Sequence, residues 1–130
     1  MHIVIGGAYN GKRKYVYDRV EKPYTEFEGI IPDTYFTKDE TVIISGFEQL
    51  VMAYQTHDEL QVAEIIVTKL KKLASETNVI CICNDLGRGV VPIDKEERFL
   101  RDACGRVYQK LFQEAQSVTR VWYGLGERLK

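Results

Sequence analysis

The chain has 130 residues, the usual length of one domain and enough for a sizeable hydrophobic core, so we expect a single domain over residues 1–130. The hydrophobic fraction of 45% and the charged fraction of 28% are typical of soluble globular proteins, and the net charge of -1 excludes an overall basic field for nucleic acid or an anionic membrane. No apolar run approaches the roughly 20 residues that span a bilayer and we expect no secretory signal, so neither a nucleic-acid partner nor a membrane partner is predicted.

The beginning of the chain predicts a buried strand that leads into a helix. Residues 2–5 are a short β-branched run that ends at Gly6 and Gly7. A helix is expected to follow over about 11–20. The stretch 21–40 contains two prolines and a glycine and is expected to be mostly loop.

The middle of the chain predicts two more strands with helices between them. Residues 41–45 are the second strand, and a short helix is expected over 47–55. Asp58 is expected to cap an amphipathic helix whose apolar residues recur at helical spacing. Residues 78–83 are the third strand, and their apolar run is typical of a sheet with helices on both faces.

The last third of the chain predicts a loop, a long helix and one or two strands. A glycine-containing loop is expected over 84–92, and Asp94 is expected to cap the long helix that follows. Residues 118–123 are the fourth strand, with Trp122 and Tyr123 expected in the core, and a short strand is expected after them. Strands that alternate with helices predict a mainly parallel sheet in a three-layer α/β domain.

The three cysteines indicate a protein with reduced thiols. Cys81 and Cys83 alternate along the third strand, and Cys104 lies in the long helix. An odd number of cysteines without a disulfide-dense layout favours a cytoplasmic protein. The spacing of Cys81 and Cys83 does not match a zinc site, so no metal ligands are predicted and the cysteines are expected to be buried.

The segment from Gly6 to Arg13 has the spacing of a phosphate-binding loop. Gly6, four intervening residues, Gly11 and Lys12 stand between a strand and a helix. Glycines let backbone N–H groups converge on phosphate oxygens, the helix N-terminus adds partial positive charge, and the lysine can reach the β- and γ-phosphates. The alternative is a strand-to-helix turn that only uses glycine. The candidate nucleotide-binding residues are Gly6, Gly7, Ala8, Tyr9, Asn10, Gly11, Lys12 and Arg13.

A second motif begins at Asn84 and has the sequence Asn-Asp-Leu-Gly-Arg-Gly-Val-Val-Pro. Together with the glycine loop, it resembles the bifunctional adenosylcobinamide kinase / adenosylcobinamide-phosphate guanylyltransferase family of cobalamin biosynthesis. Residues 1–20 and about 78–130 match the motifs of that family in order and spacing. Further matching residues are Arg98, Arg101, Asp102, Gly105, Arg106, Val107, Gln109, Val121, Gly124, Gly126, Leu129 and Lys130.

The resemblance implies a P-loop NTPase fold related to RecA, an ATP or GTP ligand, a corrinoid second substrate and a homo-oligomer. It also implies kinase activity, with Lys12 and Asp85 as the candidate catalytic residues. Asp85 lies where the third strand ends, and it could order a metal-bound water or accept a substrate hydroxyl proton. The alternative, left open, is that Asn84 and Asp85 only terminate the strand in a turn.

The chain also departs from the family at positions that carry chemistry. The family has Ser after the loop lysine, where it ligates Mg²⁺, but this chain has Arg13, whose guanidinium only donates hydrogen bonds. Ser45 stands where the family has an acid at the end of a central strand, with Glu48 one helical turn further on. Neither His2 nor His57 matches the family's guanylyl-accepting histidine, whose segment this shorter chain lacks. These departures put Mg²⁺ in doubt and predict that guanylyl transfer is lost.

Three functions remain open from the sequence. The first is an ATP- or GTP-dependent kinase acting on the hydroxyl of the corrinoid's aminopropanol arm, with Lys12 stabilising γ-phosphate charge. The second is a non-catalytic subunit that binds nucleotide or phosphate, in which Arg13 provides a fixed cation near the magnesium position. The third is a structural module with a relic loop.

Overall fold

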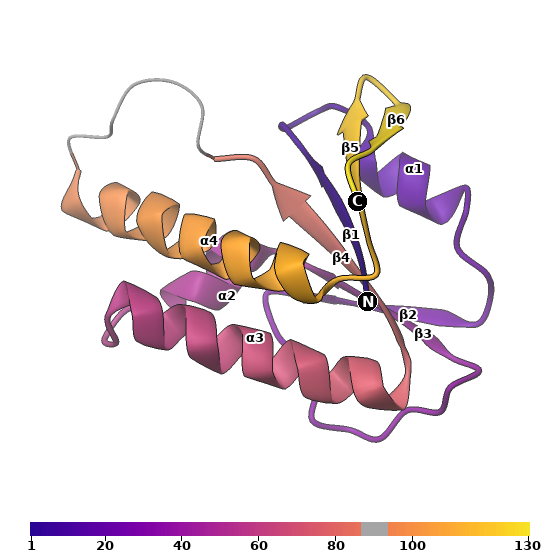
Figure 1. Ribbon diagram of the computed structural model, residues 1–130, viewed down its shortest axis with the longest axis horizontal. Coiled ribbons are helices and arrows are strands. Elements are labelled where there is room, and N and C mark those ends of the chain that lie inside the picture. Colours follow the sequence, from indigo (N-terminus) through magenta and orange to yellow (C-terminus); the bar gives the residue numbers. More distant parts are fainter. Residues whose placement is uncertain (87–93) are drawn as a thin grey trace.

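A six-stranded sheet with the strand order β2-β3-β4-β1-β5-β6 forms the centre of the molecule (Figure 1). The computed structural model describes residues 1–86 and 94–130, so the predictions made for 87–92 lie outside the described residues. The strands are β1 (His2–Gly6), β2 (Tyr24–Glu28), β3 (Thr41–Ser45), β4 (Asn78–Asn84), β5 (Ser117–Trp122) and β6 (Leu125–Arg128). The helices are α1 (Lys12–Tyr17), α2 (Phe47–Met52), α3 (Glu59–Glu76) and α4 (Lys95–Glu114).

The sheet is parallel except at one edge, as the alternation of strands and helices predicted. β1 pairs in parallel with β4 on one side and with β5 on the other, and β3 pairs in parallel with β4 and β2. Only β6 is antiparallel to its neighbour β5. The glycine loop, the segment from Gly6 to Arg13, therefore begins at the carboxyl end of a strand that lies between two parallel neighbours.

Helices cover both faces of the sheet, which confirms the three-layer α/β architecture. On one face Val16 of α1 packs with Val4, Ile43, Ile82 and Val121 from the strands. On the other face α3 and α4 pack together over the main core (Figure 1). β3 and β4 are apolar because both of their faces are buried between these layers.

Both long helices begin at the predicted caps. Asp58 and Gln61 form a capping box at the start of α3, in which each side chain accepts a hydrogen bond from the other residue's backbone N–H. Asp94 accepts hydrogen bonds from the backbone N–H groups of Glu96 and Glu97 at the start of α4. No helix in the described part of the chain is long and apolar enough to cross a membrane.

One prediction about local structure was wrong, and another missed a strand. The stretch 21–40 is mostly loop, as predicted, but it contains the edge strand β2, whose parallel ladder with β3 outweighs the loop signals of Pro23 and Gly29. Trp122 and Tyr123 lie outside the core, with 64% and 74% of their surfaces exposed. The chain leaves the core after Val121 and turns at Tyr123 and Gly124, both of which have positive φ.

The cysteines behave as the sequence predicted. All three lie in the described part of the chain, and all are free and buried. Burial raises the pKa of the Cys81 thiol to about 12 and that of Cys104 also to about 12, so both stay protonated at neutral pH. These side chains therefore pack as small hydrophobic residues.

Candidate functional site

The glycine loop turns the chain from β1 into α1. Gly11 caps α1 with a φ of 84°, and its carbonyl accepts a hydrogen bond from Tyr15 N at 2.9 Å. Glycine adopts this left-handed conformation without the steric cost that a Cβ imposes. Tyr9 also has a positive φ, 63°, and its side chain is fully exposed. The backbone is thus folded tightly just before the helix N-terminus.

Gly6 is required by the close approach of β1 and β5. A Cβ atom on Gly6 would lie 2.4 Å from the carbonyl oxygen of Val121, which no real Cβ contact allows. The backbone of β5 therefore passes directly beside the start of the loop. This contact fixes where the loop begins relative to the end of β5.

Lys12 is a nearly buried cation at the loop. Its exposed fraction is 8%, and its Nζ donates a hydrogen bond to the Gly7 carbonyl oxygen at 2.9 Å. Burial lowers the pKa of Lys12, and the negative charge of Glu48 opposes this shift. The ammonium group is thus held by the loop's own backbone and close to a carboxylate.

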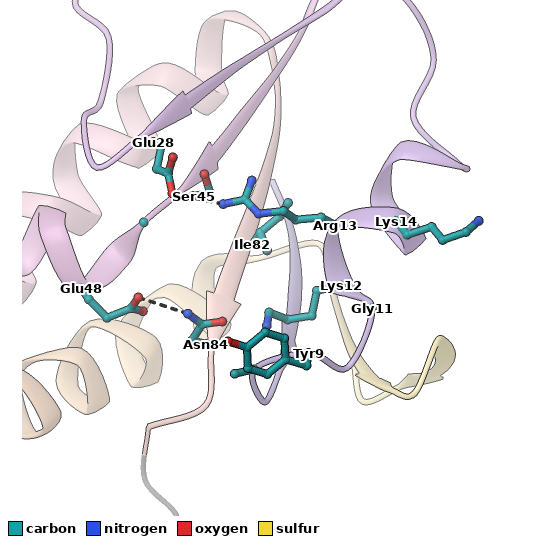
Figure 2. A pocket seen from close by; sticks show the side chains of 12 residues that line it. Tyr9, Gly11, Lys12, Arg13, Lys14, Glu28, Ser45, Glu48, Ile82 and Asn84 are labelled. Carbon is teal, nitrogen blue, oxygen red and sulfur yellow. Dashed lines mark hydrogen bonds and ion pairs between the residues drawn. The ribbon is translucent and has the colours of Figure 1, made fainter.

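A cavity of about 450 Å³ lies between the loop and the carboxyl ends of β3 and β4. Lys12 and Asn84 point toward the same space, with Glu48 of α2 on the side of Asn84 away from Lys12 (Figure 2). The cavity volume is within the range of small-ligand sites, and its position is where open α/β sheets bind ligands. Of the predicted loop residues, the cavity is lined by Ala8, Tyr9, Gly11, Lys12 and Arg13.

Arg13 lies in an ion-pair cluster with the edge strand β2. Its guanidinium contacts Glu26, and it also contacts Glu28 at 3.3 Å. The hydroxyl of Ser45 donates to Glu26 at 3.1 Å, and the hydroxyl of Tyr17 also donates to Glu26. The two residues that depart from the magnesium-binding pattern, Arg13 and Ser45, thus meet at one carboxylate. Sequence analysis missed Glu26 and Glu28 because their segment was predicted to be loop.

Glu48 is a further acidic residue whose role the sequence did not establish. Its Oε2 accepts a hydrogen bond from Asn84 Nδ2 at 3.1 Å, and its Oε1 is buried without a hydrogen-bond partner. Buried carboxylate oxygens in native proteins nearly always have a partner, so this atom is a candidate contact for a bound group. The Glu48 carboxylate lies among the cavity's lining residues together with Lys12.

Asp85, the second candidate catalytic residue, lines a different cavity from Lys12. This second cavity has a volume of about 400 Å³ and shares the loop residues Gly6, Gly7 and Asn10. The Asp85 backbone N–H donates to the Gly6 carbonyl oxygen at 2.9 Å, which holds the end of β4 against the loop. Lys12 and Asp85 are thus both at the loop but on different sides of it.

The histidines lie away from both cavities. Nδ1 of His2 is 2.6 Å from the hydroxyl of Ser117, at the amino end of β1. His57 follows α2 and is 3.5 Å from the hydroxyl of Thr56. Neither ring lines the cavities beside the glycine loop.

Comparison with known proteins finds the same family that the sequence motifs resemble. The model of the family described as CobU, cobinamide kinase / cobinamide phosphate guanyltransferase, matches residues 9–129. The bifunctional adenosylcobalamin biosynthesis protein CobU of Salmonella typhimurium is 33% identical over 73 residues, which are 56% of this chain and 38% of that protein. The protein of the same name from Escherichia coli is 38% identical over 52 residues, which are 40% of this chain and 29% of that protein. The matched segments therefore span less than two fifths of either relative.

Proposed function

This chain belongs to the cobinamide kinase / cobinamide phosphate guanyltransferase family and has its P-loop NTPase fold, and on that premise we propose that it binds ATP or GTP at the glycine loop. The observation that carries the proposal is that Lys12, a nearly buried cation, lines a cavity of about 450 Å³. A triphosphate would take the place of the Gly7 carbonyl as the partner of Lys12 Nζ. A charge-assisted hydrogen bond to phosphate is stronger than one to a neutral carbonyl.

The candidate reaction is phosphoryl transfer within cobalamin biosynthesis. The acceptor is the hydroxyl of the aminopropanol arm of a corrinoid: its oxygen forms a bond to the γ-phosphorus, and the bond from that phosphorus to the β-phosphate oxygen breaks. Lys12 stabilises the charge on the moving group, and Asp85 accepts the hydroxyl proton. Because Asp85 lies beside Gly6 in the second cavity, the acceptor hydroxyl in this account approaches the γ-phosphate from the side of the loop opposite Lys12.

Magnesium usually accompanies a nucleoside triphosphate in such a site. The residues at the two expected ligand positions do not fit it, because Arg13 is itself a cation and the hydroxyl of Ser45 is engaged with Glu26. We therefore propose that magnesium contributes little to nucleotide binding, by less than about tenfold in affinity.

A non-catalytic nucleotide-binding subunit is the second candidate function. The cluster around Glu26 favours it, because Arg13 and the hydroxyl of Ser45, which stand at the two expected magnesium-ligand positions, are both engaged with that carboxylate. The positions of His2 and His57 support loss of guanylyl transfer, since neither is near the loop. In this reading the chain acts within a homo-oligomer or with a subunit that provides the missing groups.

Turnover separates the two functions. The chain is incubated at high concentration with adenosylcobinamide and ATP or GTP, with and without Mg²⁺, and the corrinoid is analysed for a phosphate ester. A phosphorylated corrinoid supports the kinase. Nucleotide binding without any such product supports the non-catalytic subunit.

The Glu48→Gln variant tests whether the negative charge of Glu48 weakens the binding of an anionic ligand in the cavity. We expect it to bind tripolyphosphate about fivefold more tightly in the absence of metal, because it removes one negative charge near Lys12, an effect on the order of 1 kcal/mol. The amide oxygen of glutamine can still accept the hydrogen bond from Asn84. Calorimetry in EDTA and then in Mg²⁺ measures both affinities.

Glu64→Gln, a change of the same chemistry on the outer surface of α3, is the matched control and is expected to have no effect. A variant of Glu48 that loses affinity specifically in Mg²⁺ would show that this carboxylate holds the cation. That result would contradict the small role we propose for magnesium.

A further inference from the structure

An exposed pair of aromatic rings stands at the carboxyl end of β5. Trp122 is 64% exposed and Tyr123 is 74% exposed, and their ring centroids are 5.5 Å apart. Trp122 is the only tryptophan of the chain. Leaving such large apolar surfaces in water costs free energy, so their place next to a ligand cavity calls for a partner.

The turn that carries these rings is fastened to the glycine loop. The backbone N–H of Gly124 donates to the Asn10 carbonyl oxygen at 2.7 Å. A Cβ atom on Gly126 would lie 2.4 Å from the hydroxyl oxygen of Tyr15 in α1, so β6 also passes close to this helix. The β5–β6 hairpin stands beside α1 (Figure 1). The backbone of the turn that carries the aromatic pair is therefore held in place relative to the loop.

The second cavity joins the glycine loop to Trp122. It has a volume of about 400 Å³, and Gly7 and Asn10 line it on the loop side, Asp85 on the β4 side and Trp122 on the β5 side. β4 and β5 flank β1, so their ends are two strand spacings apart, about 10 Å. The glycine loop borders both cavities, so a nucleotide whose phosphates lie on the loop beside Lys12 can extend its ribose and base toward the β5 end of the second cavity.

The charges in this cavity favour a neutral ring at the β5 end. Arg120, which also lines it, is paired with Glu127 at 2.7 Å, so its charge is compensated. The other residues at that end are Val121, which is apolar, and Trp122, whose indole offers a flat face. Every nucleobase has a π-face, and stacking on tryptophan suits it without a charged partner.

We propose that Trp122 stacks on the base of the nucleotide whose phosphates occupy the glycine loop. This inference rests on the proposed function, because it needs a nucleotide at the loop. Trp122 is a binding residue in this account and takes no part in the chemistry at the γ-phosphate. It makes the β5–β6 hairpin the base-binding part of the site.

The single tryptophan makes the proposal directly measurable. GTP, ATP and inorganic tripolyphosphate, which lacks a base, are titrated while the emission of Trp122 is followed, and calorimetry records binding in parallel. We expect both nucleotides to quench the emission on saturation. Tripolyphosphate is expected to bind and to leave the emission unchanged.

The Trp122→Ala variant provides the matching affinity change. It is expected to bind GTP about 5- to 100-fold more weakly, the range for loss of one base–aromatic stack, and to bind tripolyphosphate within twofold of the unaltered chain. Trp122→Phe is expected to recover part of the loss. Tyr35→Ala serves as the control, because it removes an 81% exposed aromatic ring that lines a cavity containing none of the loop residues.

Each other outcome has a definite meaning. Nucleotide binding that leaves the emission unchanged, or an equal loss for GTP and tripolyphosphate in Trp122→Ala, would overturn the stacking proposal and leave phosphate binding intact. Conversion of an oligomer to a monomer by Trp122→Ala, with nucleotide affinity unchanged, would assign the rings to an interface between copies and also overturn it. Absence of binding by every one of these ligands would overturn the proposed function as well.

Discussion

Replacing Lys12 by alanine is expected to weaken the binding of GTP and tripolyphosphate by about 10- to 150-fold. Lys12 is the nearly buried cation of the loop, and its ammonium already donates to a backbone carbonyl there. A hydrogen bond to a charged group contributes about 1.5–3 kcal/mol, and its loss leaves phosphate charge without a partner. Calorimetry with both ligands measures the change, and thermal shift shows whether ligand still stabilises the variant.

Lys14→Ala is the matched control for this experiment. Lys14 lies two residues further along α1 and borders the same cavity, but its side chain points away from the cavity (Figure 2), is 81% exposed and pairs with Asp18. An exposed pair of this kind contributes little, so the variant is expected to bind both ligands within about threefold of the unaltered chain. Equal losses in the two variants would indicate a general effect of positive charge and would count against a specific site at Lys12.

Replacing Gly6 by alanine is expected to destabilise the fold by about 2–3 kcal/mol and to abolish nucleotide binding. The added Cβ would lie 2.4 Å from the Val121 carbonyl oxygen, and both groups belong to the backbone of paired strands. Overpacking of this kind forces backbone shifts that typically cost about 1–3 kcal/mol. Denaturant unfolding followed by circular dichroism measures the loss.

Gly105→Ala is the same chemical change as Gly6→Ala, but it is expected to raise the stability of the fold. Gly105 lies in the middle of α4, and a Cβ there would meet nothing within 4 Å. Alanine is favoured over glycine in a helix by about 0.5–1 kcal/mol, so this variant is expected to be more stable. A Gly6→Ala chain with unchanged stability would mean that β1 and β5 are further apart than the structure places them.

The elements that the sequence predicted well are those with strong local signals. The capping residue Asp58 and the periodic apolar pattern after it identify α3 without any tertiary information. The edge strand β2 was missed because its side chains are all exposed or half-buried, without a regular alternation, and because it lies between a proline and a glycine. Its strand conformation depends on pairing with β3, which the local sequence does not indicate.

The sequence predicted the part of the candidate site that is continuous along the chain, but not the residues that other strands contribute. The spacing from Gly6 to Lys12 indicated the loop, because phosphate binding there depends on consecutive backbone groups. The groups that come from other elements, Glu26 in β2 and Trp122 at the end of β5, join the site only when the sheet forms. Trp122 was assigned to the core because its hydrophobicity alone does not tell whether the strand has already left the interior.

The central claim is that the glycine loop binds a nucleoside triphosphate, and amide chemical shifts test it most directly. GTP is added to isotopically labelled protein, and the backbone amide signals are followed residue by residue. We predict saturable shifts concentrated at residues 6–13, with smaller ones at Asn84 and Asp85. Absence of shifts at 6–13 at millimolar GTP, or shifts confined to another surface, would contradict the claim.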